Sequence, residues 1–321
     1  MRAIEYAITL LKNGKLVAIP TETVYGLGAD ARNPIAVQKI YTAKGRPSTN
    51  PLIIHIPNPD AIIDFAIDVP DDAWQLAKHF WPGPLTLILK RHPSVPLIVT
   101  GGQETVALRI PNHPLTLELL QAFNGGIAAP SANPSGRISP TTAEHVQEGL
   151  GAAVDFILDG GACTIGIEST IVSCISDPPM ILRQGSISAE MLNAVLGKDV
   201  LEPSAKHNIH FPGSQLSHYA PHHPLYLLDK ESLLQKVKKL SEENKAVSVL
   251  SFEKKPVDKQ FLITEWIAVS HDPIHYAQQL YHTLHHLDKT KCDYILIERP
   301  PNTREWLAIR DRLQRAAYST N

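Results

Sequence analysis

The segment AKGRPSTNP, residues 43–51, places two cations on either side of a glycine. Lys44 offers a compact point charge and Arg46 a planar fork of donors, a combination that attracts a polyphosphate. Gly45 allows a ligand to approach the backbone, and Asn50 adds an amide a few residues further on. A cation at a helix end also interacts favourably with the helix dipole. The segment therefore indicates a phosphate site, with a simple helix end as the alternative.

A second group of polar side chains lies in PTETVYGLGAD, residues 20–30, where an apolar run ends. Thr21, Glu22 and Thr23 provide two hydroxyls and a carboxylate at the end of a predicted strand. Small polar binding sites are commonly built from loops at strand ends. A turn capped by its own side chains explains the same residues.

Two polar residues interrupt strands that otherwise carry core residues. His55 lies in the apolar run PLIIHI, and a single histidine in such a strand is usually a core residue satisfied by its neighbours. Arg109 follows Val106 and Leu108 in TVALRIP, so it projects from a strand rich in core residues. A half-buried arginine requires an anion. That anion is either a substrate carboxylate or an internal Asp or Glu.

Three further loops carry hydroxyls, an amide and a cation. AAPSANPSGRISP places Ser131, Asn133 and Ser139 before a predicted helix, whose free N-terminal amides favour a phosphate. The alternative is that Ser139 or Thr142 only caps that helix. GIESTIV and MILRQG add Ser169 and Arg183. These groups all lie at strand ends of the first 200 residues, which predicts a site for a small anionic substrate and a nucleotide.

The common nucleotide and hydrolase signatures are absent from the sequence. It contains no GxxxxGK[ST] and no GxGxxG, so a nucleotide would be bound by another kind of loop. It also lacks HExxH and GxSxG, which removes the main support for a zinc protease or an α/β-hydrolase.

The order of helical and extended patterns predicts two α/β domains. Residues 1–200 alternate such patterns, and some neighbouring strands lack a helix between them, as in a mixed sheet. Residues 201–223 are rich in proline and show no periodicity, which predicts a linker. Residues 224–321 again alternate strands and helices and predict a small Rossmann-like domain.

Length and composition are those of a soluble globular protein. The chain has 321 residues, enough for two domains, with 43% hydrophobic and 19% charged residues. The formal net charge of −2 gives no global attraction to nucleic acid or to an anionic membrane. No run of eighteen apolar residues is present, and the first residues lack the pattern of a signal peptide. We therefore expect a cytoplasmic protein without a membrane role.

The cysteines and histidines predict no metal site. The three cysteines, Cys163, Cys174 and Cys292, form no CxxC and are expected to be buried free thiols. Four histidines in DPIHYAQQLYHTLHHLD fall mostly on the polar side of a predicted helix. They are expected to be solvated.

The combination of motifs resembles a known family. PTETVYGLG, KGRPxxxP, PLIIHI, ALRIPxHP, PSANPSG, GIESTIV and ILRxG, in that order and spacing, are similar to the YrdC family of threonylcarbamoyl-AMP synthases. The linker ending in HYAP and the small α/β tail resemble the two-domain form of that family. The resemblance implies a twisted mixed-sheet YrdC-like domain followed by a small Rossmann-like domain.

The resemblance also implies an activity. Members of the family make L-threonylcarbamoyl-AMP and pyrophosphate from L-threonine, bicarbonate or CO₂, and ATP. A separate tRNA threonylcarbamoyl transferase complex then modifies the adenosine beside the anticodon. Mg²⁺ would arrive on the ATP phosphates rather than in a protein cage. Whether the chain binds tRNA directly stays open.

The resemblance assigns roles residue by residue. The positions that match the family's phosphate signature are Lys44, Arg46, Ser131 and Asn133, with Lys44 and Arg46 as the catalytic pair. The positions that match threonine contacts are Thr23, His55, Arg109, the backbone of Ala129, and Ser169. The remaining ATP contacts are Asn50, Thr105, Ser139, Arg183 and, from the linker, Tyr219.

One segment departs from the family pattern. Family linkers read close to SPGMxxxHYAP, whereas this chain reads FPGSQLSHYAP, with Ser214, Gln215 and Ser217 in place of more typical residues. The grip of the linker on a triphosphate is therefore expected to differ.

Two other functions fit parts of the pattern. An RNA-binding module would use Lys44, Arg46 and Arg109 on a basic surface, but the chain lacks an aromatic platform and a net positive charge. A carbamoyl-handling enzyme of the same fold, such as the YrdC-like part of hydrogenase-maturation carbamoyltransferases, would carry further regions that are missing here.

Overall fold

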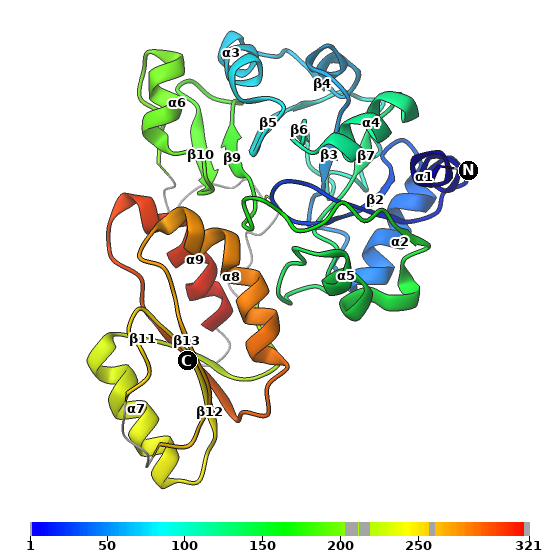
Figure 1. Ribbon diagram of the computed structural model, residues 1–321. Helices are drawn as coiled ribbons and strands as arrows, with labels where there is room; N and C mark the ends of the chain where they lie inside the picture. Colours follow the sequence, from blue (N-terminus) through cyan, green and yellow to red (C-terminus); the bar gives the residue numbers. More distant parts are fainter. Residues whose placement is uncertain (1, 203–210, 212–218, 257–260, 318–321) are drawn as a thin grey trace. The chain divides into compact units, whose positions relative to one another are not determined.

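The computed structural model describes residues 2–202, 211, 219–256 and 261–317 (Figure 1). Most of the segment predicted as a linker, including Ser214, Gln215 and Ser217, lies outside these residues.

The chain divides into two compact units. The first comprises residues 1–135 and 139–214, and the second comprises residues 136–138 and 215–321. The boundary falls within the predicted linker. The three-part division at 200 and 223 stays a prediction, because most of the linker is not described.

The first unit alternates helices with short strands (Figure 1). In the described part of the chain its α-helices are α1 (Ala3–Lys12), α2 (Pro34–Lys44), α3 (Asp71–Phe80), α4 (Pro114–Phe123), α5 (Ala143–Leu150) and α6 (Ala189–Leu196). Its 3₁₀ segments are η1 (Pro59–Asp64) and η2 (Gly151–Ala153). Its strands are β1 (Val17–Ile19), β2 (Gly26–Asp30), β3 (Ile53–His55), β4 (Ala66–Ile67), β5 (Leu85–Arg91), β6 (Thr105–Arg109), β7 (Ile127–Ala128), β8 (Phe156–Ile157), β9 (Thr170–Ser173) and β10 (Met180–Arg183).

These strands form one mixed sheet. Its order is β10-β9-β5-β6-β3-β7-β2-β1-β8, with β4 paired to β5 outside that path. The pairs β3–β6, β5–β9 and β1–β8 are parallel, whereas β5–β6, β2–β7 and β9–β10 are antiparallel. The mixed sheet predicted from strands without an intervening helix is therefore confirmed.

The two faces of the β3–β10 half of this sheet are covered differently. Ile54, Val106 and Leu108 face a large core that also contains apolar residues of α2, α3 and α6. Because neighbouring residues of a strand point to opposite faces, the residues between them lie on the other side. That side carries a smaller apolar cluster, here called the apolar floor, formed by Ile53, Ile88, Ala107, Ile171, Leu182 and Phe211. Polar side chains on the apolar-floor side of the sheet therefore point away from the main core.

The second unit is built on a parallel sheet. In the described residues its strands are β11 (Leu225–Leu228), β12 (Val247–Ser251), β13 (Ile263–Ala268) and β14 (Tyr294–Glu298), in the order β11-β14-β12-β13. Its helices are α7 (Lys230–Glu242), α8 (Pro273–Asp288) and α9 (Leu307–Ala317), with the 3₁₀ segment η3 (Arg304–Trp306). α7 lies on one side of the sheet and α8 and α9 on the other (Figure 1). This is the Rossmann-like arrangement expected from the sequence.

Helix α8 agrees with the expected polar face, with one exception. Asp272 caps its start by accepting from the Ile274 amide, and His275, His282 and His286 are exposed. The exception is an apolar residue: Ile274, in the first turn of α8, is 75% exposed. No group of three His, Cys, Asp or Glu side chains in the described residues could hold a metal ion.

The predicted state of the cysteines is confirmed. Cys163, Cys174 and Cys292 are free and buried. Among the described residues, no helix is long and apolar enough to span a membrane.

Asp288 fixes the chain segment that leads into the second sheet. Its carboxylate accepts hydrogen bonds from the amides of His222 and His223 at 2.8 and 3.0 Å, and from both imidazole Nδ1 atoms at the same distances. Burial alone would raise the pKa of Asp288, but these hydrogen bonds lower it overall. A carboxylate with a lowered pKa stabilises the fold above its unfolded pKa, and this contribution is lost as pH falls through the folded pKa.

We therefore expect Asp288→Asn to reduce the free energy of unfolding at neutral pH by about 1.5–3 kcal/mol, the range for hydrogen bonds to a charged group. The loss should shrink as pH falls from about 4 through the lowered folded pKa, below which the wild-type carboxylate is also protonated. Urea unfolding at several pH values measures it. A loss that is equal at all pH values would contradict the assigned role of the carboxylate charge.

Candidate active site

His55 and Arg109 lie side by side at the ends of two parallel strands. β3 pairs with β6 so that these two residues are Cα partners. Each follows a member of the apolar floor, Ile53 or Ala107, by two residues, and both side chains therefore project from that face. Each is only 3% exposed. The strand pattern predicted the position of Arg109, and the structure shows that the side chain is fully buried.

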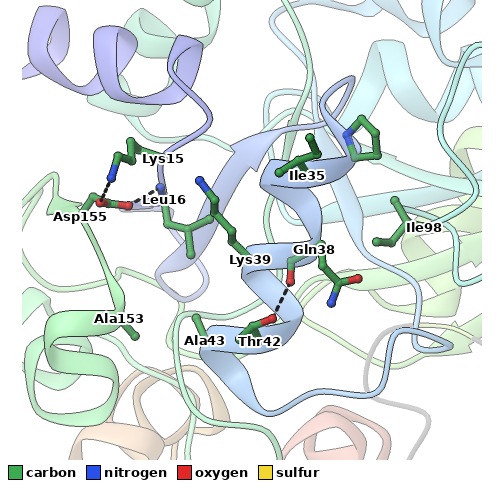
Figure 2. A pocket seen from close by; sticks show the side chains of 11 residues that line it. Lys15, Leu16, Ile35, Gln38, Lys39, Thr42, Ala43, Ile98, Ala153 and Asp155 are labelled. Atoms are coloured by element: carbon green, nitrogen blue, oxygen red, sulfur yellow. Dashed lines mark hydrogen bonds and ion pairs between the residues drawn. The ribbon is translucent and has the colours of Figure 1, made fainter.

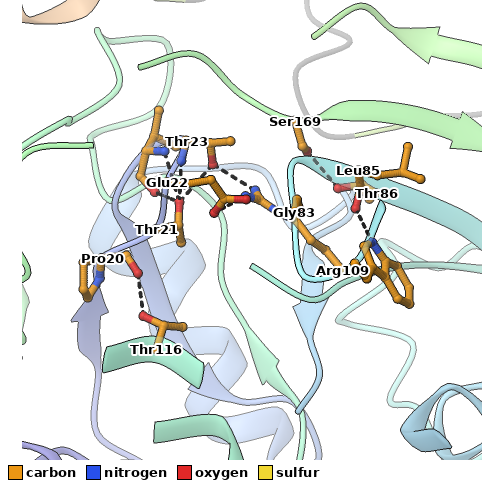
Figure 3. A network of polar contacts seen from close by, with 12 residues as sticks. Pro20, Thr21, Glu22, Thr23, Gly83, Leu85, Thr86, Arg109, Thr116 and Ser169 are labelled. Carbon is orange, nitrogen blue, oxygen red and sulfur yellow. Dashed lines mark hydrogen bonds and ion pairs between the residues drawn. The ribbon is translucent and has the colours of Figure 1, made fainter. Parts of the chain in front are cut away.

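The Arg109 guanidinium is held by three groups (Figure 3). Nη1 donates to Thr23 Oγ1 at 2.9 Å, and Nε donates to the Gly83 carbonyl at 3.1 Å. Nη2 lies 2.8 Å from Glu22 Oε2. Of the two anions considered for this arginine, the internal carboxylate is thus present in the fold. A substrate carboxylate would have to approach beside it.

The loop that carries Glu22 and Thr23 is a capped turn as well as part of this network. Thr21 Oγ1 accepts from the amides of Thr23 and Val24 at 3.1 Å each and donates to the Val24 carbonyl at 2.6 Å. Its hydroxyl also bonds the hydroxyl of Thr23 at 2.9 Å. The turn therefore holds Thr23 in place to receive Arg109, so both interpretations of PTETV apply.

His55 is not the satisfied core histidine that its strand position favoured. Among the described residues, none forms a hydrogen bond with its buried Nδ1. Burial, and secondly the charge of Arg109, lower the pKa of His55 to about 3. The ring is therefore neutral near pH 7 and offers a lone pair rather than a charge.

Ser169 and Arg183 form a second network next to β5. Arg183 Nε donates to the Ser169 carbonyl at 3.0 Å, and Nη2 donates to its hydroxyl at 3.1 Å. The same hydroxyl bonds Thr86 Oγ1 at 2.8 Å (Figure 3). Thr86 was not selected from the sequence, because its contact with Ser169 depends on the register between β5 and β9.

The Lys44 corner is positioned by helix α2. Asn33 caps the start of the helix by accepting from the amides of Ile35 and Ala36, and the helix ends at Lys44. Gly45 follows with a φ of 59°, a left-handed conformation that favours glycine. Lys44 is only 4% exposed, so it is not a solvated cation at a helix end.

The ammonium of Lys44 reaches the loop that contains Ser131. Nζ donates to the Ser131 carbonyl at 2.6 Å and to the carbonyl of Asn133. Burial, and secondly the charge of Arg46, hold the pKa of Lys44 well below its usual 10.5. Arg46 itself donates from Nη2 to the Pro51 carbonyl at 3.1 Å. Two cations thus lie close together, and the partners of Lys44 are uncharged carbonyl groups.

One chain segment connects the two polar groups. The amide of Ala129 donates to the Ile53 carbonyl at 2.9 Å, next to His55. Two residues later, the Ser131 carbonyl accepts from Lys44. Residues 129–131 therefore link the strand of His55 to the Lys44 corner within the first unit.

The other predicted ATP contacts are placed less directly. Ser139 does not cap helix α5; Thr142 does so, and the Ser139 hydroxyl donates to Glu168 Oε1 at 2.7 Å. Thr105 starts β6, and the register that pairs Ile53 with Ala107 places it level with the residue after Asn50. Glu168 was not selected from the sequence, although it directly precedes Ser169 in GIESTIV.

Tyr219 belongs to the second unit. Its ring lies 5.5 Å from that of Tyr281, and the guanidinium of Arg312 lies 5.7 Å from its centroid. Its φ is 64°, which is uncommon for a residue with a side chain. The predicted contact between Tyr219 and ATP stays a prediction.

A separate hollow of about 710 Å³ lies on the outer face of α2 (Figure 2). Its lining includes Ile35, Gln38 and Lys39 but none of the predicted site residues. The Lys39 ammonium donates to the Gly14 carbonyl at 2.7 Å, and Lys15 pairs with Asp155 at 3.3 Å. This hollow is therefore distinct from the candidate active site.

Two family models together match most of the chain. Residues 9–185 match the model of the Sua5, YciO and YrdC proteins, described as "Telomere recombination". Residues 187–318 match the model described as "Threonylcarbamoyl-AMP synthase, C-terminal domain". The chain belongs to the Sua5/YciO/YrdC family, as its motifs predicted.

Full-length relatives identify the two-domain branch of the family. The threonylcarbamoyl-AMP synthase of Bacillus subtilis is 42% identical, over 98% of this chain and 92% of that protein. The enzyme of the same name from Pyrococcus abyssi is 38% identical, over 98% of this chain and 94% of that protein. The crystal structure of P. abyssi Sua5 complexed with L-threonine superposes with a TM-score of 0.91 at 38% identity, covering 99% of this chain and 94% of that one. The predicted fold is confirmed by this match.

Proposed function

We propose that the protein is a threonylcarbamoyl-AMP synthase that joins L-threonine, bicarbonate or CO₂, and ATP into L-threonylcarbamoyl-AMP and pyrophosphate. The observation that carries the proposal is the continuity of two polar groups in one unit of a chain from this family. The first, here called the Arg109 group, consists of Arg109, Glu22, Thr23 and His55 and suits an amino acid. The second, here called the Lys44 group, consists of Lys44, Arg46, Ser131 and Asn133 and suits a polyphosphate.

L-Threonine would occupy the Arg109 group. Thr23 and His55 provide a hydroxyl and a neutral ring beside the guanidinium, and Ala129 would contribute its backbone. Ser169 is assigned to the same ligand through the family motif. The methyl group that distinguishes threonine from serine is worth only about 1–3 kcal/mol in a pocket. Selectivity against serine should accordingly be moderate.

ATP would occupy the Lys44 group. Lys44 and Arg46 would face the phosphates, with Ser131 and Asn133 around them and Arg183 beside Ser169. Asn50, Thr105, Ser139 and Tyr219 are assigned to the same ligand through the family motif. Mg²⁺ would be carried by the phosphates and would neutralise part of their charge, since the described residues form no carboxylate cage.

The chemistry requires little covalent participation from the protein. The deprotonated amine of threonine attacks bicarbonate with loss of water, or CO₂ with loss of a proton, to give N-carboxythreonine. The new carboxylate attacks the α-phosphorus of ATP, and pyrophosphate leaves. Holding the reactants in line contributes up to about 7–11 kcal/mol. The cations at Lys44, Arg46 and Arg183 stabilise charge that develops on the phosphate oxygens.

The product would serve a separate tRNA threonylcarbamoyl transferase complex. The proposal includes a cytoplasmic location, as expected for an enzyme that supplies tRNA modification.

Binding of ATP is expected to draw a proton onto Lys44. Because the pKa of Lys44 is lowered in the free protein, a nearby triphosphate should raise it again. Isothermal titration calorimetry of ATP binding in two buffers of different ionisation enthalpy, between pH 7 and 9, should reveal uptake of up to about one proton. The uptake should disappear in Lys44→Met. Identical heats in both buffers throughout this range would contradict the expected charge change.

The proposed activity is tested by pyrophosphate release from ATP. Release should require both L-threonine and bicarbonate, should be slower with L-serine and should be absent with L-alanine. Release that is independent of the amino acid would count against the proposal.

A further inference from the structure

The buried ion pair between Glu22 and Arg109 retains unused hydrogen-bonding capacity on both sides. Glu22 is 5% exposed and Arg109 is 3% exposed. Although Oε2 and Nη2 are 2.8 Å apart, no N–H of Nη2 is aligned for a hydrogen bond. Among the described residues, neither oxygen of Glu22 receives a hydrogen bond, and Nη2 donates none. The pair therefore presents a donor and two acceptors next to each other in a buried place.

The side chains around this pair cannot replace the negative charge of Glu22. Thr23 occupies Nη1 with its hydroxyl, and His55 is a neutral ring. Glu168, a buried carboxylate next to Ser169 in the chain, accepts the Ser139 hydroxyl at 2.7 Å and is thus engaged elsewhere. Glu22 is the carboxylate that faces the guanidinium.

The free Glu22 oxygens beside the free Nη2 of Arg109 suit a ligand that carries both a positive and a negative charge. A ligand with only a carboxylate would bring a second negative group close to Glu22, and like charges at such a distance in a buried site repel strongly. A zwitterion places its ammonium near Glu22 and its carboxylate near Nη2. Both buried groups then obtain the hydrogen bonds that the fold alone does not provide.

We infer that Glu22 binds the α-ammonium of the amino-acid substrate while Arg109 binds its α-carboxylate. Glu22 thereby selects α-amino acids over carboxylic acids that lack the α-ammonium. This inference rests on the proposed function, because it concerns the amino-acid half of the same site. It assigns Glu22 a substrate contact in addition to its structural contact with Arg109 (Figure 3).

The test compares two ligands that differ only in the ammonium. L-Threonine and (R)-3-hydroxybutanoate share the carboxylate, the hydroxyl and the methyl group. Calorimetric titration of the full-length protein should show that L-threonine binds about 10- to 100-fold more tightly, the range expected for a charge-assisted hydrogen bond. In Glu22→Gln this ratio should fall to within about threefold. Glu104→Gln, which removes the exposed carboxylate that pairs with Arg91, should leave the ratio unchanged.

The ratio separates substrate binding from a role in positioning Arg109. If Glu22 only orients the guanidinium, Glu22→Gln weakens both ligands equally and the unchanged ratio overturns the inference. A wild-type protein that binds both ligands equally also overturns it, while the proposed function stands. A wild-type protein that does not bind L-threonine at all overturns the proposed function instead. If Glu22→Gln does not fold, Glu22→Asp, which withdraws the carboxylate by one methylene, should lower the ratio, and an unchanged ratio there overturns the inference.

Discussion

Lys44→Ala is expected to reduce ATP-dependent pyrophosphate release by about 10²–10³-fold, the effect of removing one preorganised group that stabilises developing charge. Lys44 is buried in the first unit, and its ammonium lies against the carbonyls of Ser131 and Asn133 rather than against a carboxylate. The side chain is therefore available to a phosphate without breaking an ion pair. Binding of L-threonine should change little, because the Arg109 group does not contain Lys44.

The matched control for this variant is Lys39→Ala. Lys39 belongs to the same helix, but it points to the outer face and bonds the Gly14 carbonyl (Figure 2). Its removal should leave pyrophosphate release within about twofold of wild type, as is usual for a surface side chain away from the site. Full activity of Lys44→Ala, or equal loss in both variants, would refute the role given to Lys44.

Arg109→Met is expected to weaken L-threonine binding by at least about 100-fold and to destabilise the protein by about 3–5 kcal/mol. The variant removes the cation of a buried pair and leaves the charge of Glu22 without its partner. It also frees the Thr23 hydroxyl and the Gly83 carbonyl, which Arg109 now occupies. Calorimetry measures the binding, and urea unfolding measures the stability.

Two further variants serve as controls for Arg109→Met. Arg109→Lys retains the charge, but a lysine cannot reach all three partners, so the fold should be less affected than threonine binding. Arg2→Met breaks two exposed ion pairs, with Glu5 and Glu118, and should leave the stability close to that of wild type. Normal threonine binding by Arg109→Met would contradict the assignment of the carboxylate site.

The sequence predicted the local elements of the fold well because they depend on neighbouring residues. The segment DPIHYAQQLYHTLHHLD was predicted to be helical, and it forms α8 with Asp272 as its cap. Alternation in TVALRIP predicted that Arg109 opposes Val106 and Leu108, which is confirmed by the position of these residues in the main core. The alternation could not predict which face of the sheet the main core covers, because this depends on where the helices pack.

The site was predicted in its residue types but not in its contacts. Motif resemblance selected Arg109, but its partner Glu22 lies in a distant loop, and only the folded sheet brings the two together. Thr86 and Glu168 were missed for the same reason, since their partners Ser169 and Ser139 become neighbours through strand pairing and loop packing. The low exposure of Lys44 was likewise not evident from a segment that looks like an ordinary helix end.

The role of the second unit is the part of the assignment that depends most on resemblance. Tyr219 matches the family's linker residue, and its ring packs against Tyr281 within the second unit. The atypical segment FPGSQLSHYAP lies largely outside the described residues, so its effect on ATP binding stays a prediction.

The central claim is that one site carboxylates the nitrogen of threonine with bicarbonate and then joins the new carboxylate to AMP. Mass spectrometry of a reaction containing the protein, ATP, Mg²⁺, L-threonine and ¹³C-bicarbonate tests it directly. The account predicts L-threonylcarbamoyl-AMP that carries the ¹³C label, and its loss when threonine is omitted or Lys44 is replaced by alanine. Formation of AMP and pyrophosphate without a labelled adenylate would contradict it.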